Sequence, residues 1–223
     1  MMVRVESPGQ PRTLGVLESV WRYPVKSLHR EALAAARLES HGIAGDRARA
    51  LYVVSGKARV GKAYRGKEHH LLHTISEETR AGDLAAAEGF EVEARDADGG
   101  HDFDDAPLSL VLSTWLDEVS GAIGRPLDVQ RWRPNLFVRS ATDAHVSESD
   151  LAQASLELGE CVLRVRSTIK RCVTTTYDVQ TGERDPDVLG YVARERANVF
   201  GIYCDVEVAG TVRSGDVLRL RDR

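Results

Sequence analysis

The segment STIKRCVTTTYDVQTGER occupies residues 167–184 and indicates a strand ending in a basic pair, followed by a hydroxyl-rich turn. Cys172 comes directly after Lys170 and Arg171, at the end of the predicted strand. Neighbouring cations favour the thiolate, which is the form of cysteine that ligates soft metals or attacks electrophiles. On composition alone, a strand cysteine without chemistry is the favoured interpretation, because most free cysteines behave as small apolar residues.

The turn after Cys172 contains three threonines and Asp178. Asp178 either orients a threonine that contacts a ligand, relays a proton, or caps the loop as an Asx turn. The sequence leaves these alternatives open.

Three further loops carry polar groups suited to an anionic ligand. Lys26 and Ser27 in YPVKS (residues 23–27) offer a cation and a hydroxyl, although an exposed lysine in a turn is the favoured interpretation of this motif alone. Arg47 in GDR (residues 45–47) either pairs with the preceding aspartate or reaches an anion. Arg133 and Asn135 in RWRPN (residues 131–135) have the donors to bind a planar heterocycle or a phosphate.

Short strands dominate the predicted secondary structure. They are expected at residues 14–23, 33–38, 48–54, 90–94, 108–112, 127–132, 136–139, 154–158, 161–167, 197–208 and 217–220. Helices are expected at residues 75–87, at residues 114–124, and after an N-cap at Asp185 with Pro186 in the first helical position. This pattern predicts a β-rich α+β protein with a barrel-like core.

Composition excludes several classes of protein. The chain has 223 residues, 42% of them hydrophobic, and a net charge of −4, which does not favour nucleic acid as a partner. No apolar run approaches the ~20 residues of a membrane span, and residues 1–13 form a polar tail without a secretory signal, so we expect a cytoplasmic protein. The three cysteines fit neither a disulfide framework, a structural zinc site nor an iron–sulfur cluster. Any redox chemistry therefore needs electrons from a partner.

Taken in order, YPVKS, GDR, RPN and the RC…TT…D block resemble the MOSC family, named after the C-terminal domain of molybdenum-cofactor sulfurases. The branch most similar contains the amidoxime-reducing components, and the similarity covers about residues 14–220. It implies a MOSC-type β-barrel at residues 105–223, packed as one compact unit with a shortened N-terminal strand-rich subdomain at residues 14–104.

The resemblance also implies a molybdenum cofactor and the residues that hold it. Cys172 takes the role of the metal ligand and, with Asp178, of a catalytic residue. The cofactor-binding residues implied are Lys26, Ser27, Arg47, Ser113, Thr114, Arg133, Asn135, Arg171, Thr175 and Thr176. Ser113 and Thr114 are included because they stand at a strand-to-helix turn, where a helix N-terminus suits a phosphate.

The activity implied is the reduction of N-hydroxylated small molecules, with electrons from a separate ferredoxin or flavin-reductase type of protein. One alternative is a carrier of cofactor or sulfur, with a persulfide on Cys172. Another is a pterin- or nucleotide-binding protein without catalysis. The basic segment at residues 56–73 is expected to be a solvated loop; the alternatives are a metal patch at His69, His70 and His73, a substrate-facing lid, or a docking site for the electron donor.

Overall fold

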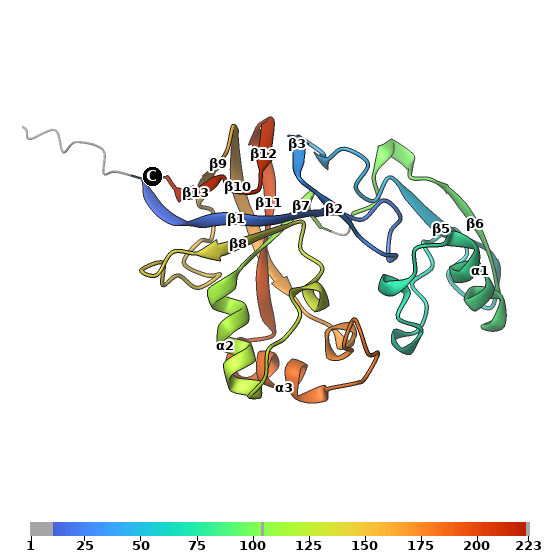
Figure 1. The fold of residues 1–223 in the computed structure, drawn as a ribbon. Coiled ribbons are helices and arrows are strands. Elements are labelled where there is room, and N and C mark those ends of the chain that lie inside the picture. The colour runs from blue at the N-terminus through green and yellow to red at the C-terminus, as the bar shows by residue number, and fades with distance from the viewer. Residues whose placement is uncertain (1–10, 104, 222–223) are drawn as a thin grey trace, which may run out of the picture.

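A closed ring of β-strands forms the main body of the protein in this computed structural model, which describes residues 11–103 and 105–221. The ring strands are β1 (Arg12–Arg22), β7 (Leu108–Leu112), β8 (Leu136–Ser140), β9 (Ser155–Leu158), β10 (Cys161–Lys170), β11 (Val199–Val208) and β13 (Val217–Leu220). Their order is β13-β9-β10-β11-β7-β8-β1, and β1 pairs with β13 to close the ring (Figure 1). Only the β7–β8 pair in this ring is parallel. The predicted β-rich α+β barrel is confirmed.

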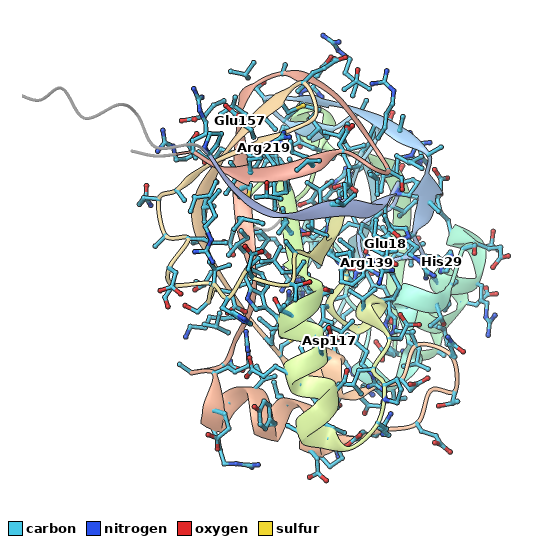
Figure 2. The ribbon with its side chains drawn as sticks, turned by 60° about the vertical axis from the view of Figure 1, so that its left-hand side comes forward. Glu18, His29, Asp117, Arg139, Glu157 and Arg219 are labelled. Atoms are coloured by element: carbon cyan, nitrogen blue, oxygen red, sulfur yellow. The ribbon has the colours of Figure 1, made fainter. Side chains whose placement is uncertain are left out.

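Apolar side chains fill the barrel. Every residue of β7 (LSLVL) is buried, which is typical of a strand covered on both faces. On the outer surface, Glu18 and Arg139 form a cross-strand ion pair of 2.8 Å, and Glu157 faces Arg219 in the register of β9 and β13 (Figure 2). Such exposed pairs add little stability, so the fold depends mainly on the apolar interior.

Smaller elements extend the barrel at its edges. β2 (Glu31–Leu33) pairs with β1, and a separate three-stranded sheet has the order β12 (Gly210–Arg213), β3 (Ala35–Glu39) and β4 (Gly42–Ile43). Because β1 is itself part of the ring, the N-terminal strand of the chain and its last strand belong to one sheet. The expected domain division after residue 104 stays a prediction.

A second, smaller unit lies beside the barrel. β5 (Arg49–Gly56) and β6 (Phe90–Asp96) form a two-stranded antiparallel sheet covered by α1 (Glu78–Ala87), to the right of the barrel in Figure 1. Its buried core is separate from that of the barrel and includes Leu51, Val53, Tyr64, Leu72 and Ile75. Residues 56–73 therefore contribute two side chains, Tyr64 and Leu72, to a core, and the expectation of a solvated loop over this whole segment is wrong.

Two helices pack against the barrel, as expected. α2 (Ser113–Ile123) buries Trp115 and Val119 and ends at Gly124 in the left-handed conformation with φ of 79°. α3 (Pro186–Glu195) begins after Asp185, whose carboxylate accepts a hydrogen bond from the backbone N–H of Asp187. Both the capping residue and the proline position follow the predicted pattern.

Several predicted elements differ from the structure. The strand expected at residues 33–38 is divided between β2 and β3, and the strand expected to end at residue 167 runs to Lys170. Residues 127–132 were expected as a strand, but the Asp128 carboxylate accepts from the Gln130 N–H and starts the 3-10 helix η4 (Val129–Trp132) instead. The helix expected from residue 75 begins at Glu78. Arg12, expected in the tail, already pairs with Leu220 in the barrel; residues 1–10 of that tail lie outside the described part of the chain.

A buried ion pair fixes the loop between β8 and β9. Both carboxylate oxygens of Glu148 accept from Arg196 Nη2 at 2.6 and 2.7 Å, and one also accepts from the Gly201 N–H at 3.1 Å. Glu148 and Arg196 expose 6% and 9% of their side chains.

Glu148→Gln is expected to lower the free energy of unfolding by about 3 kcal/mol, because it removes the buried charge partner of Arg196 and leaves only the exposed one. Glu118, the exposed second partner of Arg196, provides the control: Glu118→Gln should change the value by less than about 1 kcal/mol. Urea unfolding followed by circular dichroism measures both. Equal effects of the two variants would contradict the importance of burial.

Candidate functional site

Cys172 lies at the point where β10 leaves the barrel. It is followed by the 3-10 helix η5 (Val173–Thr176), and its side chain is exposed, with Sγ 3.5 Å from Thr174 Oγ1. Cys161 and Cys204 are buried in the barrel, as expected. The Cys172 side chain borders a cavity of about 470 Å³, a volume typical of small-molecule sites.

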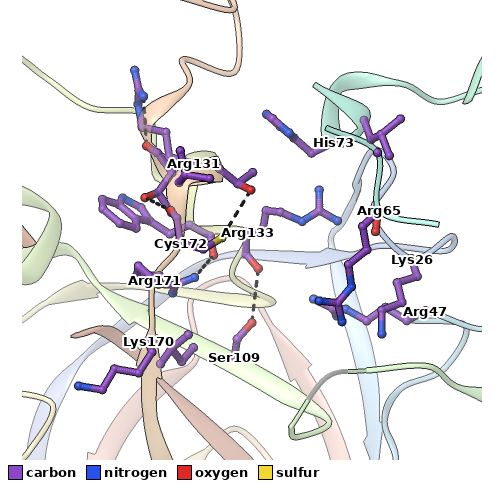
Figure 3. A pocket seen from close by; sticks show the side chains of 18 of the residues that line it. Lys26, Arg47, Arg65, His73, Ser109, Arg131, Arg133, Lys170, Arg171 and Cys172 are labelled. Carbon is purple, nitrogen blue, oxygen red and sulfur yellow. Dashed lines mark hydrogen bonds between the residues drawn. The ribbon is translucent and has the colours of Figure 1, made fainter. Parts of the chain in front are cut away.

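Two walls face each other across this cavity (Figure 3). The barrel-side wall includes Arg133, Arg171, Cys172 and Thr175. The opposite wall includes Lys26, Ser27 and Arg47 from the N-terminal part of the chain. The structure thus brings together seven of the predicted site residues, from four sequence motifs.

The charge of the cavity is strongly positive. Eight lysine and arginine residues line it, and no aspartate or glutamate does so among the described residues: Lys26, Arg47, Arg65, Lys67, Arg131, Arg133, Lys170 and Arg171. Some of these cations have carboxylate partners behind the wall. Lys26 Nζ lies 2.9 Å from Asp102 Oδ1, and Arg47 pairs with Asp46.

Arg133 and Arg171 form no ion pair within the part of the chain that the structure describes. Burial lowers the pKa of Arg133 to about 10 and has the same effect on the pKa of Arg171. Both groups stay charged at neutral pH, but their positive charge is poorly compensated. An anionic ligand in the cavity would supply the missing charge.

The Arg171 guanidinium is held in place by the barrel backbone. Its Nε donates to the Phe200 carbonyl at 2.7 Å and its Nη1 to the Trp132 carbonyl at 2.9 Å. Its Nη2 is buried without a partner, as is Trp132 Nε1. Gly201 makes room for this arrangement, because a Cβ there would lie 3.1 Å from Arg171 Nη2. Two residues that line the cavity therefore each carry a buried donor with no acceptor from the described part of the protein.

Tyr23 links two of the motifs. The Arg133 guanidinium lies 4.2 Å and the Arg47 guanidinium 4.9 Å from the centre of its ring. Its hydroxyl donates to the Pro134 carbonyl at 3.0 Å, and burial raises its pKa to about 12. The tyrosine of YPVKS thus orients the arginines of GDR and RPN relative to each other.

Three cavity residues have a left-handed backbone although none is glycine. Ser27, Arg47 and Arg133 have φ values of 71°, 49° and 51°. This conformation is unfavourable for residues with a Cβ and often marks functional sites, where the surrounding structure enforces it. It directs these side chains from tight loops toward the cavity.

Other predicted residues lie outside the cavity. The Asn135 side chain is 1% exposed; it accepts from Ser109 N and Oγ and donates to the Trp21 carbonyl, so it cross-links three strand segments. Ser113 and Thr114 bond to Ser140 at the far end of β7. The four residues from Ser109, which lines the cavity, to Ser113 span about 13 Å of strand.

Asp178 also points away from the cavity and organises the loop after Cys172. Its Oδ1 accepts from the N–H groups of Gln180 and Thr181, and its Oδ2 lies 2.7 Å from Arg131 Nη2. Arg131, whose side chain is fully buried, also donates to the Thr175 carbonyl. These hydrogen bonds to backbone N–H groups lower the pKa of Asp178. Of the alternatives left open by the sequence, the geometry agrees with the Asx turn.

The hydroxyl groups of Thr175 and Thr176 stabilise the same loop. Thr175 Oγ1 donates to the Cys172 carbonyl at 2.9 Å, and Thr176 Oγ1 donates to the Val173 carbonyl at 2.7 Å. Thr176 does not line the cavity, whereas Thr175 does. Both hydroxyls use their proton to stabilise the turn that presents Cys172.

Sequence reasoning missed several residues of the cavity. Arg65, Lys67 and His73 reach the cavity from the basic segment, and Tyr203 lines it from β11. The cations of residues 57–67 were a visible signal, but nothing local showed that Tyr64 and Leu72 anchor this segment in the second core.

A sequence model of the MOSC domain matches residues 96–219. The chain belongs to the MOSC domain family. A search of curated proteins found no match. The barrel of this MOSC chain resembles that of YuaD from Bacillus subtilis, with a TM-score of 0.58, 16% identity, and coverage of 96% of this chain and 98% of that one. YiiM from Geobacillus stearothermophilus gives a TM-score of 0.49 at 12% identity, covering 96% and 76%.

Two further observations describe the MOSC chain as a whole. No helix in the described residues combines the length and apolar character needed to cross a membrane. No group of three or more histidine, cysteine or acidic side chains is arranged for metal binding in the same residues.

His73 makes the stability of this MOSC protein depend on pH. Burial, followed by the charges of Arg133, His29 and Arg131, lowers the pKa of His73 to about 4. An unfolded histidine has a pKa near 6.5, so between these values the unfolded chain binds the extra proton. Stability is therefore complete above pH 6.5 and falls as the pH drops toward 4.

We expect the contribution of His73 to the free energy of unfolding to fall by about 1–2 kcal/mol between pH 7.5 and pH 5. His73→Gln should remove that part of the pH dependence while other groups continue to titrate. Urea unfolding of both proteins at the two pH values gives the comparison. Identical pH dependence in the two would contradict the buried neutral state of His73.

Proposed function

We propose that this MOSC protein binds the molybdenum cofactor with Cys172 as the protein ligand of the metal, and that it reduces N-hydroxylated small molecules with electrons from a separate protein. The observation that supports this most directly is the exposed thiol of Cys172 in a cavity whose basic groups include two guanidinium groups without acidic partners. A soft thiolate and several cationic donors are what a metal-bearing, phosphorylated pterin requires.

The donor groups of the cavity fit this cofactor. Arg171 Nη2 and Trp132 Nε1 are buried donors without a protein acceptor, and the pterin and its phosphate are rich in acceptors. Arg47 and Arg133 present guanidinium groups suited to bidentate phosphate contacts. The single cysteine also fits, because the cofactor brings its own sulfur ligands to the metal.

When bound, the cofactor would supply a metal centre that exchanges electrons and accepts an oxygen atom from the substrate. The protein would contribute orientation and selectivity. Cys172 fixes the metal end of the ligand, while Arg171 and Arg133 hold its anionic and heteroatom-rich parts. Asp178 and Arg131 keep the Cys172 loop in one conformation.

His73, which lines the same cavity, would contact the substrate. His73, whose lowered pKa keeps it neutral at pH 7, offers one N–H donor and one acceptor at the cavity surface. That pair can satisfy the hydroxyl and nitrogen of an N-hydroxylated group. The reduction consumes two electrons and two protons per substrate and releases water.

Metal analysis tests the proposal directly. Freshly purified protein should contain about one molybdenum atom per chain, and oxidation should release a fluorescent pterin. With dithionite-reduced methyl viologen as electron source, it should convert benzamidoxime to benzamidine. Protein that contains pterin and molybdenum but leaves benzamidoxime and other N-hydroxylated compounds unchanged would contradict the reductase activity. A persulfide on Cys172 without molybdenum would indicate a sulfur carrier instead.

A further inference from the structure

A solvent-exposed hairpin at the end of β5 lies next to the cavity. After β5, the chain turns and pairs back on it: Gly61 N donates to the Val53 carbonyl at 2.8 Å, and Val53 N donates to the Lys62 carbonyl at 3.0 Å. Lys62 N also donates to the Arg59 carbonyl, which closes the turn. Residues 57–62, hereafter the hairpin tip, are held by these bonds in a defined shape.

The hairpin tip and the segment after it are unusually basic. Residues 57–67 contain five cations and no acidic residue, although the whole chain has a net charge of −4: Lys57, Arg59, Lys62, Arg65 and Lys67. Arg65 and Lys67 line the cavity that contains Cys172, whereas Lys57, Arg59 and Lys62 do not. Lys57 and Arg59 instead border an adjoining pocket, which shares Arg65 and Lys67 with the cavity. The basic surface therefore begins at the cavity and continues outward. The adjoining pocket also contains one acidic residue, Glu88, whose side chain is 8% exposed and lies 3.9 Å from Lys67 Nζ.

An apolar side chain lies among these cations. Val60 is 60% exposed, the highest value among the large hydrophobic residues described as exposed. Arg59, next to it, has a left-handed φ of 63°, a conformation that the hairpin imposes on it. An exposed apolar centre surrounded by charged groups is the usual composition of a protein-docking surface.

The arrangement fits a protein better than other partners. Lys57, Arg59 and Lys62 cannot contact a small molecule in the cavity, because they lie outside it. A nucleic acid needs an extended basic track, but the neighbouring α1 and β6 expose acidic residues: Asp83, Glu91 and Glu93. A compact acidic patch on a protein matches both the size and the charge.

We propose that the hairpin tip docks an acidic face of the electron-donating protein, an inference that rests on the proposed function. Docking here places the donor at the mouth of the cavity that contains Cys172. Each encounter would transfer one electron, so the donor protein is oxidised twice for every N-hydroxy group reduced. Electron-transfer complexes of this kind are small and short-lived, and charge steers their formation.

Charge reversal at the hairpin tip provides the test. In the full chain, Lys57→Glu, Arg59→Glu and Lys62→Glu are combined, and benzamidoxime reduction is measured with two electron sources. With a reduced acidic [2Fe–2S] ferredoxin or an acidic flavodoxin, the rate at low salt should fall about 10- to 100-fold. With reduced methyl viologen, a small cation that the new acidic groups cannot repel, the rate should change less than about twofold. The difference between variant and wild type should shrink at high salt.

A matched variant controls for net charge. Arg37→Glu, Arg213→Glu and Arg221→Glu reverse the same number of exposed charges on other parts of the chain, and should leave both rates near wild type. Val60→Asp should lower only the protein-driven rate.

Three results would overturn the docking proposal. The two triple variants could show equal rates with the protein donors, or the wild type could turn over with the dye but with neither acidic donor. The third is that the wild type binds DNA and the charge reversal at the hairpin tip abolishes this binding. If the wild-type protein converts no benzamidoxime with the dye or with either protein donor, the reductase function itself is refuted.

Discussion

Cys172→Ser is expected to reduce bound molybdenum from about one atom per chain to less than about a tenth, and to abolish benzamidoxime reduction. A serine hydroxyl remains protonated at neutral pH and is a harder ligand, so it cannot replace the thiolate on a soft metal. Because the Cys172 side chain is exposed, the substitution should leave the fold intact. Elemental analysis, pterin release and unfolding curves on the same preparation separate these effects.

Cys161→Ala supplies the matched control for this loss. Cys161 is buried at the other end of β10, and burial raises its pKa to about 11, so it has no thiolate to offer at neutral pH. Its removal should cost about 1 kcal/mol of stability and leave the molybdenum content unchanged. A Cys172→Ser protein that keeps its metal and its activity would eliminate the proposed ligand.

Arg171→Met is expected to weaken cofactor binding about 100-fold while keeping most of the apolar volume of the side chain. The guanidinium combines an uncompensated charge with a free Nη2 donor, and both disappear in the variant. The measurement is the pterin and molybdenum content after reconstitution over a range of cofactor concentrations.

Lys170→Met controls for charge at the neighbouring position. Lys170 is exposed and its Nζ donates to the Ala197 carbonyl, so its loss should change binding less than about threefold. The Arg171 variant also leaves the Phe200 and Trp132 carbonyls without a donor, and its stability must be measured alongside. Equal affinities of the two variants would show that the positive charge at Arg171 is unimportant.

The elements that depend on residues close together in the sequence were predicted from local patterns. The alternating strands of the barrel and the capped helix after Asp185 are of this kind. Residues 127–132 were predicted as a strand because the apolar residues Leu127 and Trp132 are typical of one, whereas the Asp128 cap produces a 3-10 turn. An aspartate-capped turn is decided by one side-chain hydrogen bond, which hydrophobic periodicity does not reveal.

In the candidate site, the positions of residues that depend on contacts between distant parts of the sequence were harder to predict. The motif residues Lys26, Arg47, Arg133 and Cys172 were predicted and share one cavity. Asn135 was predicted as a cofactor ligand because an amide in a polar loop suggests ligand binding, whereas in the structure its side chain bonds to Ser109 at the start of β7 and to the Trp21 carbonyl. His73 was assigned to a solvated loop, with a metal patch or a substrate-facing lid as alternatives, because nothing local shows that the packing of Leu72 in the second core brings it to the cavity.

The left-handed backbone at Ser27, Arg47 and Arg133 implies a trade-off between stability and function in the evolution of this protein. Each residue costs roughly 1 kcal/mol or more in that conformation, and glycine would relieve the strain. Glycine would also remove the hydroxyl and the two guanidinium groups that face the cavity. Selection for thermal stability alone would therefore tend to erode the anion-binding groups, and only selection for the bound ligand would retain them.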